Sequence, residues 1–122
     1  MAPNVRNLMW IIAVFAVIAV ISISRERALA KYDPRLHSGD DEIVMLAASW
    51  CGYCQKLKSE FERAQVPYRE LDVEDGGEGE KAYGALGGRG VPITVIGQAV
   101  VHGYDTDQLN ELLQARGYTI DL

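Results

Sequence analysis

IVMLAASWCGYC, residues 43–54, is the stretch that decides the fold. Residues 43–48 form a continuous apolar run, which is typical of a short central strand covered on both faces. After residue 52 the apolar side chains recur at spacings of three and four, which predicts a helix over 52–64 with one buried face. The residues of that face are Cys54, Leu57, Phe61 and Ala64. The two cysteines of the chain therefore lie where a buried strand passes directly into a helix.

The next part of the chain predicts a second strand and a weak helix. Residues 68–73 (YRELDV) alternate in hydrophobicity, and strand, helix, strand is the parallel crossover unit. Residues 74–90 hold seven of the twelve glycines, so any helix there, around 78–86, should be weak. We expect this region to be the least stable part of the domain.

The C-terminal third predicts a hairpin followed by a helix. Residues 92–96 and 99–102 are apolar, β-branched runs joined by a Gly-Gln pair, which suits a tight antiparallel turn. A helix should begin at Asp105 and end at Gly117. Its buried stripe is Leu109, Leu112 and Leu113. The order βαβαββα predicts an α/β domain with a central mixed four-stranded sheet flanked by helices.

Composition and charge limit the classes of protein to consider. A chain of 122 residues at 48% hydrophobic suffices for one membrane segment and one small domain. Two cysteines are too few for a disulfide-stapled scaffold, or for a four-cysteine metal site within one chain. Residues 38–122 carry seven Lys/Arg against fifteen Asp/Glu, a net charge of −8, so we expect no nucleic-acid partner.

The N-terminal region predicts a membrane segment. Residues 8–21 read LMWIIAVFAVIAVI, and residues 22–24 extend the run without charge, which just reaches the minimum of about 17 residues for a crossing helix. The alternatives are a cleaved signal peptide, with residues 28–30 (ALA) as its cleavage site, and a buried core helix, although the segment has no polar face. The predicted organisation is a transmembrane or signal-anchor helix, a charged linker and a folded domain, at residues 1–24, 25–42 and 43–122.

Charged residues around the apolar run predict how it is held. Arg25, Glu26 and Arg27 resemble a stop-transfer flank and argue against cleavage, so we expect a retained single-pass anchor. Only Arg6 precedes the run, whereas four Lys/Arg follow it within residues 25–35. The positive-inside tendency then places the C-terminal domain on the cytoplasmic side, with the periplasmic or extracytoplasmic side as the alternative.

The two thiols predict redox chemistry. Cys51 lies at the positive end of the helix dipole, which stabilises a thiolate, so we expect its pKa to lie below the usual value of about 8.5. Cys51 would attack a substrate disulfide, and Cys54, one turn further on the buried face, would resolve the mixed disulfide. The alternative is an inert or metal-binding pair. A bridging iron–sulfur cluster with four sulfur ligands would need a second chain or two glutathione thiols.

Residues 43–115 resemble the glutaredoxin class of the thioredoxin fold. Three motifs in the expected order carry this resemblance: Cys51-Gly52-Tyr53-Cys54, Gly90-Val91-Pro92 and Gly103-Tyr104-Asp105. The resemblance implies an enzyme that reduces protein disulfides or glutathione mixed disulfides by dithiol exchange. It further implies glutathione as the reductant, and it requires no nucleotide or metal.

The resemblance also implies roles for residues around the thiols. The implied substrate-binding and glutathione-binding residues are Tyr53, Val91, Pro92, Gly103, Tyr104 and Asp105. Pro92 would follow a cis peptide bond, and the backbone of Val91 would pair with the substrate as an added strand. Asp105 would bind the γ-glutamyl end of glutathione, and Tyr53 would line the thiol groove. From the residues alone, Pro92 could merely begin a strand, Asp105 could cap a helix, and Tyr53 could be an exposed loop residue.

Two departures from the family pattern weaken the predicted glutathione site. Typical glutaredoxins carry a lysine shortly before the first cysteine and a Gly-Gly before the late aspartate, whereas residues 47–50 read AASW and residues 102–104 read HGY. Trp50 is more typical of thioredoxins. The second hypothesis is therefore a glutaredoxin-shaped protein recharged by a flavin-dependent reductase or another thiol carrier. Arg89 is the one cation near the groove that could take a carboxylate, although an exposed loop arginine is the simpler interpretation.

The remaining polar residues predict no further site. His37 and His102 are far apart in the sequence and have no Cys or His at ligand spacing, so we interpret both as structural. The acidic residues within 72–80 lack the spacing of a calcium loop and are best explained as a solvated loop.

Overall fold

Strand β1 (Ile43–Ala47) is the centre of the sheet in the computed structural model, which describes residues 4–122. All five of its residues are buried, as the continuous apolar run predicted. It pairs parallel with β2 (Arg69–Asp72) and antiparallel with β3 (Ile93–Ile96), which in turn pairs antiparallel with β4 (Ala99–His102). The strand order β2-β1-β3-β4 confirms the predicted mixed four-stranded sheet.

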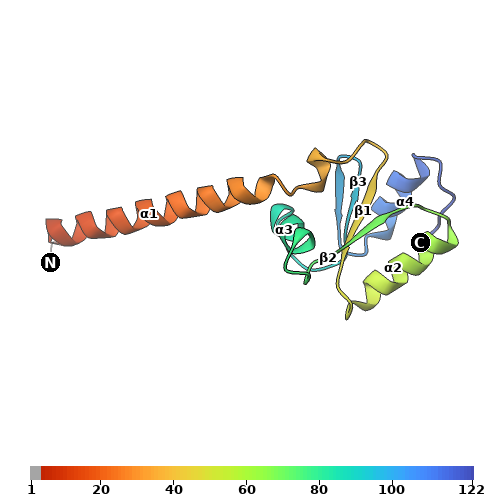
Figure 1. Cartoon of the computed structure of the whole chain (residues 1–122), viewed down its shortest axis with the longest axis horizontal. Coiled ribbons are helices and arrows are strands. Elements are labelled where there is room, and N and C mark those ends of the chain that lie inside the picture. Colours follow the sequence, from red (N-terminus) through yellow and green to blue (C-terminus); the bar gives the residue numbers. More distant parts are fainter. Residues whose placement is uncertain (1–3) are drawn as a thin grey trace.

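Helices cover both faces of this sheet (Figure 1). Helices α2 (Gly52–Arg63) and α4 (Thr106–Gln114) lie on one face, and α3 (Glu78–Ala85) lies on the other. Because each helix buries one stripe of apolar side chains, the core has two halves. The half under α2 and α4 includes Leu57, Phe61, Leu109 and Leu113, and the half under α3 includes Ala82, Leu86, Val44 and Leu46. The predicted order of elements in the domain is therefore confirmed.

The turn between β3 and β4 requires glycine. Gly97 has a positive φ of 59°, and a Cβ atom there would collide with the carbonyl oxygen of Asp40. The guanidinium group of Arg116 donates a hydrogen bond to that same carbonyl (3.3 Å). The segment before β1 and Arg116, just after α4, therefore contact each other beside this turn.

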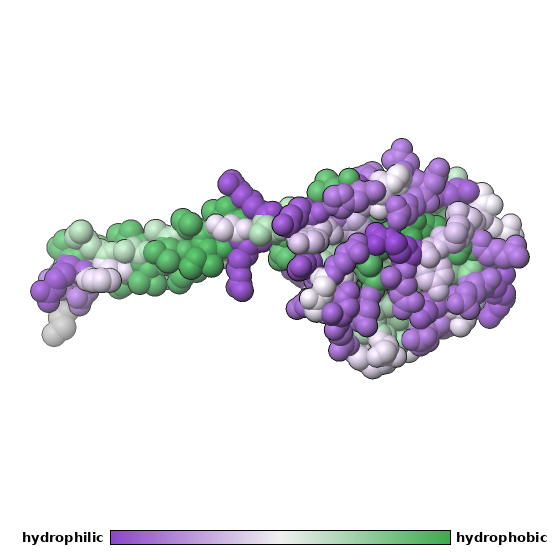
Figure 2. Space-filling model, viewed as in Figure 1, coloured by the Kyte–Doolittle hydropathy of each residue, from purple (hydrophilic) through white to green (hydrophobic). Residues whose placement is uncertain are grey.

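Helix α1 (Val5–Ala30) is longer than the apolar run that predicted it. It continues six residues beyond Ser24, because the Arg, Glu, Ala and Leu residues there are good helix formers. Its 26 residues span about 39 Å at about 1.5 Å per residue, against about 30 Å for a hydrocarbon core. None of its residues is buried, and Figure 2 shows its apolar surface standing clear of the domain. The helix is not a core helix of this chain, and it is long and apolar enough to cross a membrane.

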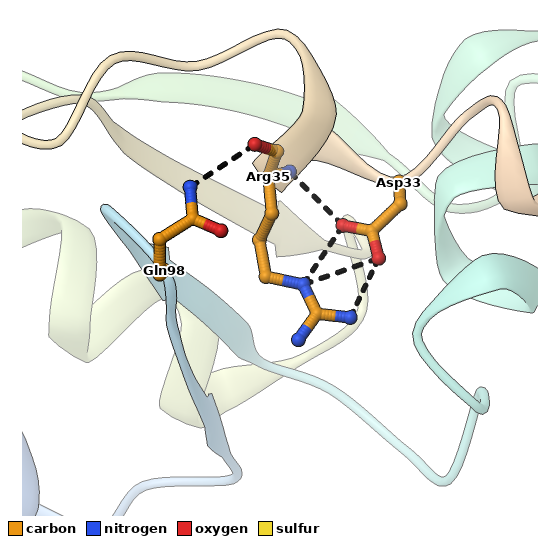
Figure 3. A network of polar contacts seen from close by, with 3 residues as sticks. All are labelled: Asp33, Arg35 and Gln98. Carbon is orange, nitrogen blue, oxygen red and sulfur yellow. Dashed lines mark hydrogen bonds and ion pairs between the residues drawn. The ribbon is translucent and has the colours of Figure 1, made fainter.

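The segment after α1, predicted as a linker without periodic structure, is attached to the domain. The Asp33 carboxylate accepts three bonds from the Arg35 guanidinium (2.6–3.1 Å), within and beside the short 3-10 helix η1 (Pro34–Leu36). The side-chain amide of Gln98, in the β3–β4 turn, donates to the backbone oxygen of Arg35 (3.1 Å), as Figure 3 shows. The linker differs from the prediction because side chains distant in sequence bind its backbone.

The end of α1 also contacts α3. The Leu29 side chain lies beside Gly84 of α3. The ammonium groups of Lys31 and Lys81 lie 5.1 and 4.8 Å from the centre of the Tyr32 ring. Hydrogen bonding to Lys81, followed by the charge of Lys31, lowers the pKa of the Tyr32 hydroxyl. The sheet face covered by α3 is therefore the one nearer to α1 (Figure 1).

Candidate active site

Cys51 and Cys54 lie in the first turn of α2, directly after β1. Cys51 is the N-cap residue, with an extended backbone (φ −83°, ψ 109°), and its Sγ accepts a hydrogen bond from the Cys54 N–H (3.1 Å). The free N–H groups and the dipole of a helix N-terminus favour negative charge at that sulfur. Cys51 keeps 5% of its surface exposed, whereas Cys54 is fully buried. Cys51 is therefore the more accessible residue of the pair.

The two cysteines are joined as a disulfide. Their Cα atoms lie 5.2 Å apart, within the usual range for such a bond. Because the α2 backbone already holds the sulfurs within bonding distance, the pair can pass between dithiol and disulfide without rearranging the sheet. A dithiol at this position can transfer two electrons.

The loop before β3 lies against Cys51. The Val91–Pro92 peptide bond is cis, as the resemblance implied, and the Val91 carbonyl oxygen lies 3.7 Å from Cys51 Sγ. The Pro92 carbonyl oxygen accepts a hydrogen bond from the N–H of Gly103, just after β4 (2.8 Å). The three predicted motifs are therefore linked by contacts, Cys51 to Val91 and Pro92 to Gly103.

Tyr53 and Tyr104 form one wall of the site. Their ring centroids are 5.3 Å apart, and Tyr53 is 62% exposed. The Lys56 ammonium lies 5.1 Å from the centre of the Tyr104 ring. The sequence pattern did not indicate this contact, because Lys56 lies outside the apolar stripe of the predicted helix.

Asp105 caps α4 as well as lying beside this wall. Its Oδ1 accepts a hydrogen bond from the Gln108 N–H (3.1 Å), which is the helix cap predicted from the sequence. The carboxylate is at an exposed residue, and the cap engages Oδ1. Helix capping and ligand binding are therefore compatible at this position.

Trp50 and Glu74 lie on the other side of Cys51, toward β2. The exposed Trp50 indole N–H donates a hydrogen bond to the Glu74 carboxylate, 24 residues away in the loop after β2. In the same loop, N–H bonds from Gly77 and then Gly79 hold the pKa of the Asp75 carboxyl below its usual value. Sequence reasoning assigned this acidic loop no role, because a contact between two exposed, distant residues leaves no periodic pattern.

Tyr83 of α3 positions the loop that carries the cis bond. Its hydroxyl oxygen accepts a hydrogen bond from the Gly90 N–H (2.7 Å), and no sequence motif predicted this contact. Arg89, beside it, is exposed, as the simpler interpretation expected. A hollow of about 450 Å³ lies here and is lined by Leu86, Gly87, Arg89 and His102.

The histidines do not come together with the cysteines as a ligand set. His37 Nε2 lies 2.7 Å from the backbone oxygen of Lys31, in the segment after α1, whereas His102 ends β4. Within residues 4–122, no group of three or more His, Cys, Asp or Glu side chains is arranged to hold a metal ion.

The fold and the site together define a class: a thioredoxin-fold protein with a dithiol/disulfide pair at the start of the helix after the central strand, beside a cis-proline loop. A glutaredoxin family model matches residues 43–101. Glutaredoxin-C4 of Arabidopsis thaliana is 32% identical over 128 residues, an alignment that covers 96% of this chain and 94% of that protein. The chain belongs to the glutaredoxin family, and with its CxxC pair it is a thiol–disulfide oxidoreductase.

Solved structures agree with this assignment. The buckwheat glutaredoxin–glutathione complex has the same fold (TM-score 0.61, 20% identity, 77% of this chain and 94% of that one). A glutaredoxin of Archaeoglobus fulgidus is 27% identical (TM-score 0.52, 62% of this chain and 89% of that one). NrdH-redoxin of Escherichia coli, a glutaredoxin-like protein with a thioredoxin-like activity profile, has a TM-score of 0.52 at 24% identity over 58% of this chain and 93% of its own.

Proposed function

We propose that this protein is a membrane-tethered oxidoreductase that reduces protein disulfides or glutathione mixed disulfides, with Cys51 as the attacking thiol and Cys54 as the resolving thiol. One observation carries the proposal. Cys51 Sγ lies at the N-terminus of α2, accepts the Cys54 N–H, and is 3.7 Å from the Val91 carbonyl beside the cis-proline. This arrangement favours a thiolate at Cys51, holds a second thiol within bonding distance, and places the backbone of Val91 beside Cys51.

The reaction proceeds in two exchange steps. The Cys51 thiolate attacks one substrate sulfur, so that a Cys51–substrate disulfide forms and the other substrate sulfur leaves as a thiolate, which takes up a proton. Cys54 then loses its proton and attacks Cys51 Sγ, which forms the Cys51–Cys54 disulfide and releases the second substrate thiol. Two electrons pass from the protein to the substrate. The helix N-terminus favours Cys51 as the nucleophile of the first step, because it stabilises the thiolate that attacks.

The groove around Cys51 orients the substrate. An extended segment that carries the disulfide would pair with the backbone of Val91 as an added strand, while Pro92 keeps the groove open next to the sulfur. For a glutathione mixed disulfide, Gly103, Tyr104 and Asp105 would hold the tripeptide at the N-terminus of α4.

Glutathione is the reductant that we propose. Two molecules would reduce the Cys51–Cys54 disulfide and leave as oxidised glutathione. The glutaredoxin relatives support this choice, and the buckwheat structure contains glutathione. A flavin-dependent thioredoxin-type reductase is the second candidate, and Trp50 before Cys51, the absence of a lysine in residues 47–50 and the NrdH-redoxin likeness favour it.

We also propose that α1 anchors the domain to a membrane as a single-pass helix. Its length, its apolar surface and the lack of buried residues along it support an environment of lipid. Charge supports the cytoplasmic side for the domain, since one Lys/Arg precedes the apolar run and four follow within residues 25–35.

A coupled turnover assay tests the proposal on the full chain in detergent micelles. A glutathione mixed disulfide is the substrate, and the electron source is either glutathione with its reductase or a thioredoxin-type reductase. We expect turnover with glutathione that disappears in Cys51→Ser. Turnover with the other reductase alone would move the protein to the second candidate. Activity with neither, in a fully reduced protein, would contradict both.

A further inference from the structure

The contact between Trp50 and Glu74 places a carboxylate at the edge of the active site. Trp50 directly precedes Cys51 and is 71% exposed, and its indole N–H donates to the Glu74 carboxylate across 24 residues of sequence. Besides α1, the described chain has three exposed large apolar residues, and two of them, Trp50 and Tyr53, flank Cys51. The Trp50–Glu74 pair therefore lies on an exposed part of the surface directly next to Cys51 in the sequence.

The loop holds Glu74 in place from both sides. The Glu74 N–H donates to Asp72 Oδ1 (2.8 Å), which forms a local turn at the end of β2. The following residue, Asp75, accepts N–H bonds from Gly77 and Gly79 (2.6 and 3.0 Å). Since the backbone is tied before and after Glu74, its side chain can reach the indole without ordering a free loop.

No cation within the described residues cancels the charge of Glu74. The ion pairs there use other carboxylates: Asp33, Glu42, Glu60, Glu70 and Glu78. Glu74 is exposed, and residues 38–122 carry a net charge of −8. Both favour a negative electrostatic potential around the Glu74 carboxylate. The Lys56 ammonium lies over the Tyr104 ring and makes no ion pair with Glu74.

We propose that Glu74 is a specificity-determining residue, which favours protein or peptide disulfides flanked by Lys or Arg over those flanked by Asp or Glu. The inference rests on the proposed function and states which of its protein disulfide substrates are preferred. A unit charge about 8 Å from a substrate charge changes the encounter rate by about threefold to tenfold at low ionic strength, and salt screens the effect. The Trp50 hydrogen bond is what keeps that charge near Cys51.

The test compares two peptides that carry the same intramolecular disulfide, one flanked by lysines and the other by glutamates. The fully reduced full chain in neutral detergent is mixed with each peptide, and the second-order rate of peptide reduction is measured. No other reductant is needed, because the Cys51/Cys54 dithiol supplies both electrons. The ratio of the two rates is the readout, since a general change in thiol reactivity cancels from it.

We expect the unaltered chain to prefer the lysine peptide by about fivefold at about 20 mM salt and to lose most of this preference at about 0.5 M. Glu74→Gln keeps an oxygen for the indole but removes the charge, and should reduce the preference to about twofold. Glu74→Lys should invert it. Trp50→Phe keeps the ring but frees Glu74, and should give a ratio between those of the unaltered chain and Glu74→Gln. Glu111→Gln, which removes an exposed carboxylate of α4, is the matched control and should leave the ratio unchanged.

An unaltered chain that reduces both peptides at equal rates would overturn the inference and leave the proposed function intact. A preference that persists in Glu74→Lys, or that Glu111→Gln abolishes equally, would overturn it as well. A reduced chain that reduces neither peptide would contradict the proposed function, and the inference with it.

Discussion

Helices α1 and α2 differ in what covers their apolar side chains. Helix α1 is apolar on all sides over most of its length and has no buried residue, and only its C-terminal end contacts the domain, whereas α2 buries Cys54, Leu57 and Phe61. The sheet covers the apolar face of α2, so the turn that carries the two cysteines lies on a packed core. The domain does not cover the apolar surface of α1, and we propose that lipid covers it.

This difference separates the two tasks of the protein. Chemistry depends on residues at the first turn of α2 and on the loops that meet there, and the proposed attachment to a membrane depends on α1. Substitutions in one helix should therefore leave the task of the other unchanged. The predictions below test that independence.

The largest effect should come from the first turn of α2. Replacing Cys51 with Ser removes the attacking thiolate, so turnover should fall to the background rate with every disulfide substrate. Cys54→Ser should lose reduction of protein disulfides but keep removal of glutathione, because a second glutathione can resolve the mixed disulfide. Loss of both activities in Cys54→Ser would argue against glutathione as the reductant. Steady-state assays of both variants in detergent provide the measurement.

Charge in the middle of α1 should detach the protein without affecting its chemistry. Val14→Arg together with Ile18→Arg would place two guanidinium groups in the hydrocarbon core, at about 2.5 to 3.5 kcal/mol each. We expect the double variant to move from the vesicle pellet to the supernatant, with its turnover of a soluble substrate unchanged. Gln55→Arg with Ser59→Arg, on the exposed face of α2, is the matched control and should stay with the vesicles. Retention of the α1 variant on vesicles would contradict the membrane proposal.

Truncating a core phenylalanine should destabilise the domain much more than truncating a phenylalanine of the proposed membrane helix. Phe61 is fully buried and meets the Tyr68 ring edge to face at 5.4 Å, so Phe61→Ala should lower the free energy of unfolding by about 3 to 5 kcal/mol. Phe15 is 66% exposed, so Phe15→Ala should change the unfolding of the domain by less than about 0.5 kcal/mol. Urea titrations of both variants in detergent measure the difference. Equal losses would show that α1 is part of the folded core.

The smallest expected effect concerns the ion pair between Asp33 and Arg35, in the segment that connects α1 to β1. The hydrogen bonds from Arg35 lower the pKa of the Asp33 carboxyl, so this pair stabilises the fold above the usual carboxyl pKa of about 3.9. The contribution, below about 1 kcal/mol for a partly exposed pair, is lost as the pH falls through the lowered pKa. Asp33→Asn should therefore lower the thermal midpoint slightly at pH 7, and the difference should vanish in acid. Asp41→Asn, at an exposed residue without an ion pair in the described part of the chain, is the matched control and should leave the thermal midpoint at pH 7 unchanged.

Periodic patterns predicted most of the fold and the centre of the site. Three local patterns predicted elements that the structure has: the apolar run of residues 43–48, the helical spacing of Leu57 and Phe61, and the Gly-Gln pair between two β-branched runs. The cis bond before Pro92 could be predicted from the family resemblance alone.

Contacts between distant polar residues could not be predicted in this way. The Gln98 bond to Arg35, the Tyr83 bond to Gly90 and the Trp50 bond to Glu74 each join segments that only the folded sheet brings together. None of these side chains changes the local periodicity of its segment. For this reason the segment after α1 was predicted only as a charged linker, and the acidic loop was given no role.

Trapping the mixed disulfide tests the central claim most directly. The reduced Cys54→Ser chain is incubated with a disulfide peptide, remaining thiols are blocked by alkylation, and mass spectrometry locates the adduct. Cys51→Ser, which keeps Cys54, is the comparison. The account predicts one peptide per chain attached to Cys51, and little or no adduct on the buried Cys54 of the second variant. An adduct on Cys54 in Cys51→Ser, with none on Cys51 in Cys54→Ser, would contradict the assignment of the attacking thiol.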